Sequence, residues 1–408
     1  MKKYGLIGEK LGHSFSPQIH EMLYGYDYRL YEVPRNGLPD FLKNTGLSGF
    51  NVTIPYKQDV IPFCGTLAPN AEEIGSVNTV IRESDGSLSG YNTDYFGFEY
   101  MLKKSGFSVS GKKVLVLGSG GASKTVVAVL KNHGASPVVI ISRNGEDNYE
   151  NISRHFDAEA IVNTTPVGMY PDTGRAPVNL KDFKCCRLVL DLIYNPHRTE
   201  FLLEAEDLGI PAYNGLTMLV AQAKKAGDLF TSSNLDEDII EKTAALISAQ
   251  TRNIALIGMP GSGKTTVGRK ISEITGREFA DLDEEIEKAL GRTIPEVIAE
   301  EGVPYFRAAE TRILREISKK SGMVIATGGG VVTIPENRRL LKQNSFTVLI
   351  ERPLSELESD GRPLSQSKGV ETLYKERKQL YLDWSDFKVN NTAPESTAKE
   401  IIETISKL

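Results

Sequence analysis

Cysteine is scarce in this sequence: three of 408 residues are too few for a disulfide framework, and no Cys or His spacing is typical of a zinc site. Blocks of Lys and Arg are missing and the net charge is −5, which gives no reason to expect nucleic acid as a partner. Apolar runs of about 18 residues are also missing, which argues against a membrane partner. The short apolar start is unlike a secretory signal. We therefore expect a cytoplasmic, multidomain, enzyme-like protein.

The length and composition indicate a large folded protein. A chain of 408 residues exceeds one ordinary core and favours two or three domains. With 40% hydrophobic and 25% charged residues, its composition is that of a globular protein. Short apolar runs alternate with longer amphipathic stretches, which predicts β-α-β units, parallel sheets and the α/β class. The predicted strands include residues 113–117, 137–141, 254–257, 323–326 and 346–350.

Two boundaries divide the chain. A predicted helix over 236–248 precedes a new strand at 254–257, so the main boundary lies near 251–252. A softer boundary falls at 107–111. Glycine-rich turns follow the strands at 113–117 and 254–257, and such strand-to-helix turns bind phosphate through backbone N–H groups. The sequence therefore predicts two nucleotide sites in separate units.

The second glycine-rich turn carries the stronger motif. Residues 258–265 fit G-x-x-x-x-G-K-[ST], in which the glycines let backbone N–H groups surround phosphate oxygens. The Lys264 ammonium would reach the terminal phosphates, and the Thr265 hydroxyl would bind Mg²⁺. The expected ATP-binding residues are Gly261, Ser262, Gly263, Lys264, Thr265 and Thr266.

Acidic, glycine and arginine motifs follow this turn. Asp281 and Asp283 lie at a predicted strand end, on one side of an extended segment; one would hold Mg²⁺ and the other a substrate hydroxyl. The alternative is that Asp283 caps a helix. Three glycines at 328–330 follow another strand and allow a ligand to approach the backbone. Guanidinium groups suit bidentate binding of carboxylate or phosphate, although each arginine alone is more often a surface residue. The candidates are Arg307, Arg362 and Arg377.

Together these motifs resemble shikimate kinase over roughly residues 253–408. The resemblance implies that Asp283 binds substrate hydroxyls and that Arg307, in a Phe-Arg-x-x-Glu motif, binds the substrate carboxylate. It implies further substrate contacts at Gly328, Gly329, Gly330 and Arg377, and a mobile lid that carries Arg362. Lys264, Asp283 and Arg362 would be the catalytic residues, and Asp281 would join Thr265 at Mg²⁺. The family's usual second arginine before the lid is absent here.

The first glycine-rich turn, residues 118–122, is that of a dinucleotide fold, although this variant is weak evidence alone. Where NAD-binding folds place an acidic residue, at the end of the next strand, Arg143 stands instead and suits the 2′-phosphate of NADP. Only 18 residues separate Asn144 from Asn163, which leaves room for one short helix, expected over 148–156. The expected cofactor contacts are Gly118, Ser119, Gly120, Gly121, Ala122, Ser142, Arg143, Asn144 and Gly215.

Two further motifs carry a possible catalytic pair. Residues 51–57 form a strand-like run that ends in Lys57, and a lysine in a partly dry cleft can exchange a proton with an alcohol or carbonyl. Residues 90–94 end in Asp94, a candidate carboxylate. The alternatives are a surface lysine and a helix-capping aspartate.

In combination these motifs resemble shikimate dehydrogenase. The matching motifs begin with Ser14-Phe-Ser-Pro and continue at residues 51–57, 75–79, 90–94, 163–169, 191–196 and 215–223. The resemblance implies that Ser14 and Ser16 bind the substrate carboxylate and that Lys57 and Asp94 are the catalytic pair. The residues implied to contact the substrate's hydroxyls or ring are Thr53, Asn78, Asp94, Tyr194 and Gln222.

The two resemblances imply a bifunctional enzyme of the shikimate pathway, with NADP(H), ATP and Mg²⁺ as cofactors and small molecules as substrates. Residues 1–105, joined by about 217–250, would form a substrate lobe, 106–216 a Rossmann-like NADP lobe and 252–408 a P-loop kinase domain. Two alternatives are a non-catalytic sensor of the pathway and an NAD-preferring quinate/shikimate dehydrogenase fused to the kinase. The presence of Lys57, Asp94, Lys264 and Asp283 disfavours the first, and Arg143 with the two serines disfavours the second. The oligomeric state stays open.

Overall fold

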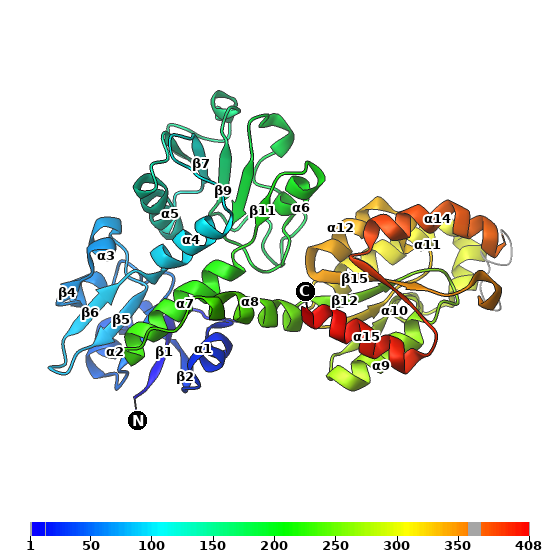
Figure 1. Cartoon of the computed structure of the whole chain (residues 1–408), viewed down its shortest axis with the longest axis horizontal. Coiled ribbons are helices and arrows are strands. Elements are labelled where there is room, and N and C mark those ends of the chain that lie inside the picture. The colour runs from blue at the N-terminus through cyan, green and yellow to red at the C-terminus, as the bar shows by residue number, and fades with distance from the viewer. Residues whose placement is uncertain (1, 13, 358–368, 408) are drawn as a thin grey trace. The chain divides into compact units, whose positions relative to one another are not determined.

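A computed structural model describes residues 2–12, 14–357 and 369–407. The chain forms two compact units (Figure 1). The first comprises Met1–Val167, Ala176–Tyr194 and Glu204–Ala245; the second comprises Gly168–Arg175, Asn195–Leu203 and Leu246–Leu408. Within the described residues, no helix combines the length and apolar character that a membrane span requires.

The first unit begins with a six-stranded mixed sheet of order β2-β1-β3-β5-β6-β4. Strands β2, β1 and β3 are parallel, whereas β5 runs antiparallel to both β3 and β6. The sequence pattern predicts parallel sheets in the chain and does not predict these antiparallel pairs. The strands are β1 (Tyr4–Gly8), β2 (Tyr28–Glu32), β3 (Gly49–Val52), β4 (Thr66–Leu67), β5 (Thr79–Arg82) and β6 (Leu88–Tyr91). The neighbouring helices are α1 (Ser16–Tyr24), α2 (Leu38–Asn44) and α3 (Pro69–Ile74).

Two long helices connect this sheet to the next. Helix α4 (Thr93–Lys104) follows β6 and packs against α7 (Leu216–Thr231), which also contacts α1. Phe98 and Met101 of α4 and Met218 of α7 join the apolar core of the second sheet. Helix α4 therefore packs into the core of the second sheet, while Thr93 at its start lies 2.9 Å, hydroxyl to hydroxyl, from Thr79 of β5. Helix α8 (Asp238–Thr251) follows α7.

The second sheet is parallel throughout, in the order β11-β10-β9-β7-β8. Its strands are β7 (Val114–Leu117), β8 (Val138–Ile141), β9 (Ala160–Asn163), β10 (Leu188–Asp191) and β11 (Ala212–Tyr213), with α5 (Gly121–Asn132) and α6 (Glu200–Asp207) between them. All four residues of β7 are fully buried, as expected for a central parallel strand. Between β8 and β9, the helix predicted over 148–156 is shorter than expected, since only a 3₁₀ turn at Ile152–His155 forms.

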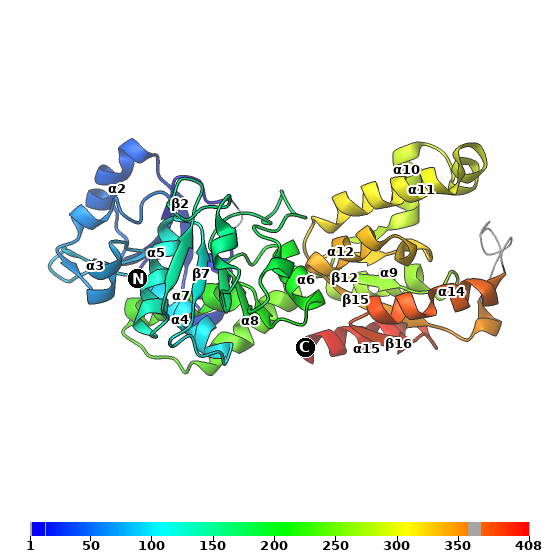
Figure 2. The same ribbon diagram turned by 90° about the horizontal axis from the view of Figure 1, so that it is seen from above.

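The second unit contains a parallel sheet of order β13-β14-β12-β15-β16. Its strands are β12 (Asn253–Ile257), β13 (Phe279–Asp281), β14 (Val324–Ala326), β15 (Ser345–Glu351) and β16 (Phe387–Asn390). Its helices are α9 (Lys264–Thr275), α10 (Leu282–Leu290), α11 (Ile294–Ser318), α12 (Pro335–Asn344), α14 (Val370–Trp384) and α15 (Pro394–Lys407). Separate apolar cores on the two faces of the sheet place α9 and α15 on one face and α11, α12 and α14 on the other (Figure 1). Helix α10 packs beside α11 (Figure 2). The predicted α/β class with parallel sheets is confirmed.

Candidate active sites

A lysine and an aspartate that the sequence proposed as a pair meet in the first unit. The Lys57 Nζ lies 2.6 Å from the Asp94 Oδ2, and the two side chains are 22% and 14% exposed. The Lys57 carbonyl accepts from the Val77 backbone N–H at 2.8 Å, which fixes the loop after β3. Asp94 lies in the first turn of α4, where the helix N-terminus favours a carboxylate. The helix cap is Asn92, so Asp94 is free of the capping role considered for it.

Asn78 lies against the same turn of α4. Asn78 is 3% exposed, and its Oδ1 accepts from the Thr93 backbone N–H at 2.7 Å. Thr93 immediately precedes Asp94 in the chain. The structure thus brings three predicted site residues, Lys57, Asn78 and Asp94, to one short stretch of backbone.

The two predicted carboxylate-binding serines also lie together. The Ser14 hydroxyl lies 3.2 Å from the Ser16 hydroxyl and accepts from the Ser16 backbone N–H at 3.2 Å. The ring of Phe15, between them, lies 5.7 Å from the ring of Tyr194. Burial raises the pKa of the Tyr194 phenol, which keeps it protonated and able to donate a hydrogen bond.

Thr53 and Gln222, two further residues predicted to contact the substrate, also belong to the first unit. The Thr53 backbone N–H donates to the Ile7 carbonyl at 3.0 Å, which places Thr53 just beyond the paired ends of β1 and β3. Gln222 projects from α7, and its Cβ would lie 3.1 Å from a methyl group added at Gly97, one turn beyond Asp94 on α4. Thr53 therefore follows β3, in the segment that leads to Lys57, and Gln222 lies beside α4, the helix that carries Asp94.

The dinucleotide turn leaves room above the start of α5. Gly118 adopts φ +104°, and an added methyl there would lie 2.8 Å from the Thr164 hydroxyl, so the turn is tight at this point. Gly120 caps α5 and Gly121 is its first residue, and no protein atom lies within 4 Å of a methyl added at either. Open space before exposed backbone N–H groups fits a pyrophosphate. Ser119 and Ala122 belong to the same turn.

Arg143 and its neighbours follow the end of β8. The Ser142 backbone N–H donates to the Asp147 carbonyl at 3.1 Å, which folds the following loop back, and Arg143 and Asn144 are exposed. Gly215 caps α7, and an added methyl there would lie 2.0 Å from the Leu192 carbonyl oxygen. Of the residues predicted to contact NADP, Arg143 is therefore exposed, and Gly215 lies where its backbone passes close to that of Leu192.

In the second unit, β12 leads into the phosphate-binding loop. Gly258, Gly261 and Gly263 all have positive φ, and this backbone is what a loop around phosphate requires. The Lys264 ammonium is buried and donates to the Gly258 and Met259 carbonyls at 3.0 and 2.9 Å. These contacts hold the ammonium across the loop. Ser262 is fully buried within it, and Thr266 lies on the first turn of α9.

The predicted Mg²⁺ ligands meet directly, since the Thr265 hydroxyl donates to the Asp281 Oδ2 at 2.6 Å. Oxygen donors of this kind are the ligands that Mg²⁺ prefers. Among the described residues, no group of three or more His, Cys, Asp and Glu side chains is placed to hold a metal ion. Mg²⁺ sites commonly use one or two protein oxygens together with water and substrate phosphates.

The prediction that Asp281 and Asp283 share an extended segment is wrong. Strand β13 ends at Asp281, whose Oδ1 accepts from the Asp283 backbone N–H at 3.0 Å and so caps α10. Asp283 lies in the first helical turn. A carboxylate cap followed by acidic residues stabilises a helix N-terminus, which explains why the chain turns here. Burial, together with the nearby Asp281 carboxylate, raises the pKa of Asp283.

The three consecutive glycines each make room for a neighbouring group. An added methyl would lie 2.7 Å from the Asp283 Oδ1 at Gly328, 2.5 Å from the Pro260 ring at Gly329, and within the Arg307 guanidinium at Gly330. The Gly329 carbonyl accepts from the Arg377 guanidinium at 3.1 Å and from the Tyr381 hydroxyl. The predicted substrate contacts therefore converge on one segment.

Glu310 is a site residue to which the sequence assigned no role. Its side chain is fully buried, and its Oε2 accepts from the Arg307 Nη1 at 2.7 Å. Burial raises the pKa of the Glu310 carboxyl although Arg307 opposes the shift. The spacing of three residues on a helix is the available sequence signal for this ion pair. Glu310 orients the arginine that was predicted to bind a carboxylate.

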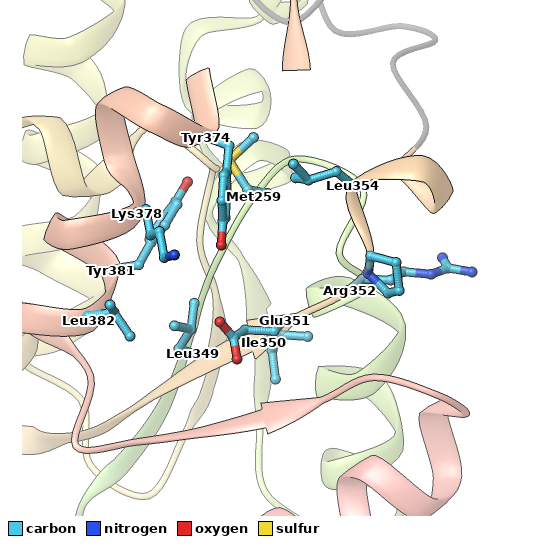
Figure 3. A pocket seen from close by; sticks show the side chains of 11 residues that line it. Met259, Leu349, Ile350, Glu351, Arg352, Leu354, Tyr374, Lys378, Tyr381 and Leu382 are labelled. Carbon is cyan, nitrogen blue, oxygen red and sulfur yellow. The ribbon is translucent and has the colours of Figure 1, made fainter. Parts of the chain in front are cut away.

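These groups line a cavity of about 600 Å³ that also contains Lys264, Thr265 and Arg377. A second cavity of about 190 Å³ lies between the end of β15 and α14, where Tyr374, Lys378 and Glu351 point inward (Figure 3). Arg352 lines both cavities. The predicted lid arginine, Arg362, lies outside the described residues.

Comparisons with known proteins match the two halves separately. The family model for the shikimate dehydrogenase substrate-binding domain matches residues 6–80, and the family model for shikimate kinase matches residues 260–406. Shikimate dehydrogenase (NADP(+)) from Clostridium perfringens is 37% identical over 262 residues, which cover 59% of this chain and 96% of that protein.

Solved structures give the same result for the first half. A chorismate mutase/shikimate 5-dehydrogenase fusion protein from Clostridium acetobutylicum is 38% identical, with a TM-score of 0.58 over 60% of this chain and 97% of that one. Quinate dehydrogenase from Corynebacterium glutamicum, in complex with NAD, is 27% identical, with a TM-score of 0.55 over 59% of this chain and 98% of that one.

Proposed function

Because the chain belongs to the shikimate dehydrogenase family and carries a shikimate kinase domain after it, we propose that it catalyses two consecutive reactions on one molecule. The first is NADPH-dependent reduction of 3-dehydroshikimate to shikimate; the second is ATP- and Mg²⁺-dependent phosphorylation of shikimate to shikimate 3-phosphate. The proposal assigns 1–105 and about 217–250 to substrate binding, 106–216 to NADP and 252–408 to the kinase. The Lys57–Asp94 ion pair is the observation that carries the first reaction.

In the proposed reduction, Ser14 and Ser16 bind the substrate carboxylate and place the ring over the Lys57–Asp94 pair. Bound NADPH would supply a hydride to the C3 carbonyl. The oxygen that gains charge needs a proton, and an ammonium 2.6 Å from a carboxylate is oriented to deliver one. Thr53, Asn78, Tyr194 and Gln222 bind the hydroxyls or ring.

We propose that the dehydrogenase prefers NADP(H). The start of α5 would receive the pyrophosphate, and the exposed Arg143 guanidinium would bind the 2′-phosphate. Arg143→Ala should raise the NADP⁺ KM by about tenfold, as loss of a charge-assisted contact predicts, and leave the NAD⁺ KM unchanged. Steady-state kinetics with both nucleotides would measure this. A wild type that prefers NAD⁺ and quinate would favour the alternative dehydrogenase.

In the proposed phosphorylation, the chain positions two substrates and neutralises charge. Lys264 and the backbone of residues 261–266 would hold the ATP phosphates, and Thr265 and Asp281 would bind Mg²⁺. Arg307, oriented by Glu310, would bind the shikimate carboxylate while Asp283 receives the attacking hydroxyl. The glycines at 328–330 and Arg377 complete the substrate site, and Arg362, outside the described residues, would help to neutralise charge.

The proposal is tested on the purified full chain by two assays. Shikimate-dependent reduction of NADP⁺ and shikimate-dependent formation of ADP should both occur. Binding of shikimate without either turnover would favour the non-catalytic sensor. Formation of ADP without reduction of NADP⁺ would contradict the dehydrogenase half alone.

A further inference from the structure

A chain of buried hydrogen bonds runs from the edge of the first sheet to Asn78. The Tyr28 hydroxyl donates to the Asn51 Oδ1 at 2.7 Å, and the Asn51 Nδ2 donates to the Thr79 hydroxyl at 2.9 Å. The Thr79 hydroxyl in turn lies 2.9 Å from the Thr93 hydroxyl. We call Tyr28, Asn51, Thr79 and Thr93 the polar chain; each is at most 6% exposed. Buried polar groups of this kind are costly unless paired, so their geometry is well determined.

The direction of the hydrogen bonds follows from their donors. Asn51 Nδ2 can only donate, so the Thr79 oxygen accepts from it. The single proton of the Thr79 hydroxyl is then available for Thr93 at 2.9 Å or for the Asn78 Oδ1 at 3.2 Å. The hydrogen bonds of Tyr28 and Asn51 therefore fix the position of the Thr79 hydroxyl, which in turn bonds groups beside the proposed substrate site.

The Asn78 amide is held by hydrogen bonds to Thr79 and Thr93. Its Oδ1 accepts from the Thr93 backbone N–H, a group that can only donate, so the oxygen and nitrogen positions of the amide are unambiguous. Its Nδ2 donates one of two protons to the Thr93 hydroxyl at 3.1 Å. Within the part of the chain that the structure describes, the second N–H of this amide has no acceptor, so it can donate to a ligand. Asn78 thus offers a donor and not an acceptor to the substrate.

The far end of the polar chain is held by aromatic packing. The His20 ring stacks on the Tyr28 ring with centroids 4.1 Å apart and planes 7° apart, and its Nδ1 lies 2.7 Å from the Tyr26 hydroxyl. Burial lowers the pKa of His20 to about 3, so the imidazole stays neutral at physiological pH. The His20 ring that stacks on Tyr28 therefore does not change its charge near physiological pH.

We propose that Thr79 is a positioning residue of the dehydrogenase site: its hydroxyl fixes Asn78 so that an amide N–H faces a substrate oxygen, and ties it to the turn of α4 that carries Asp94. This inference rests on the proposed function. Thr79 itself does not touch the substrate; it acts through Asn78 and Thr93.

The test compares Thr79→Val, which removes the hydroxyl at nearly constant shape, with Thr79→Ser, which keeps it. In the full chain, Thr79→Val should raise the shikimate KM of NADP⁺ reduction by about tenfold, the effect of one buried hydrogen bond. Its NADP⁺ KM and the rate of ADP formation should stay at wild-type values. Thr79→Ser should restore a shikimate KM within about twofold of wild type.

Thermal unfolding of both variants separates positioning from support of the fold. A lower melting temperature for Thr79→Val with an unchanged shikimate KM would overturn the proposal. If Thr79→Val does not fold, Tyr28→Phe removes only the first donor of the polar chain; it should raise the shikimate KM, and a wild-type KM would overturn the proposal. A wild type that does not reduce NADP⁺ with shikimate would instead overturn the proposed function.

Discussion

At position 330 only glycine leaves space for the neighbouring Arg307 side chain. A methyl group at this position would overlap the Arg307 guanidinium, which is the far end of a long side chain, and Gly330 has an ordinary φ of −100°. Gly330→Ala should therefore fold normally and displace the arginine from Glu310. We expect the shikimate KM of ADP formation to rise by at least about tenfold, since a shift of 1 Å in a positioning group can cost about 100-fold.

Gly46→Ala provides the matched control, because no atom lies within 4 Å of a methyl group added there. Kinetics of both variants, with melting temperatures, would check the prediction. A wild-type shikimate KM for Gly330→Ala would show that Arg307 can move without loss of substrate binding.

At the scale of residues, motifs predicted identities better than contacts. Lys57 and Asp94 are 37 positions apart, and only the fold shows that their charged groups lie 2.6 Å apart. Asp283 was placed on an extended segment because spacing alone does not reveal that the Asp281 carboxylate ends the strand by capping α10. Glu310 contacts Arg307 and Thr79 contacts Asn78, and although both residues lie within motifs, a motif does not show that a residue holds another side chain in place.

The start of α5 allows a prediction at the scale of an element. Gly120 has φ −78°, and a methyl group added there meets no protein atom, so Gly120→Ala should not lower the melting temperature. If a pyrophosphate lies against this helix N-terminus, the methyl group should obstruct it and raise the NADP⁺ KM by about tenfold or more, with the shikimate KM unchanged. Gly118→Ala should instead destabilise the unit, because φ is +104° there. Equal NADP⁺ KM values for Gly120→Ala and wild type would contradict the assignment.

Hydrophobic runs predicted elements well where the sheets are parallel. The predicted strands at 113–117, 254–257 and 346–350 match β7, β12 and β15 within one or two residues. The antiparallel pairing of β5 was not predicted, since strand direction depends on how the chain returns and not on local pattern. The loop after β8 forms one 3₁₀ turn in place of the helix expected over 148–156.

At the scale of the whole molecule, the resemblance of the two halves to two families is confirmed, and so is the α/β class. Ordered motifs allowed this because each places a particular chemistry at a strand end, where parallel sheets bind ligands. The sequence pattern did not predict which segments form each compact unit. Residues 168–175 and 195–203 belong to the second unit, although they lie within the first half of the chain.

Lys57 and Lys264, the lysines of the two proposed sites, belong to different compact units, which predicts that each activity can be removed alone. Lys57→Ala should lower shikimate-dependent NADP⁺ reduction by at least about 100-fold, because it removes the proton donor, and leave ADP formation at the wild-type rate. Lys264→Ala should have the reverse effect, because the ammonium that spans the phosphate-binding loop is lost. Lys43→Ala, which removes an exposed lysine, should change neither activity. Loss of both activities in either catalytic variant, with an unchanged melting temperature, would show that the two reactions depend on each other and would contradict independent sites on one chain.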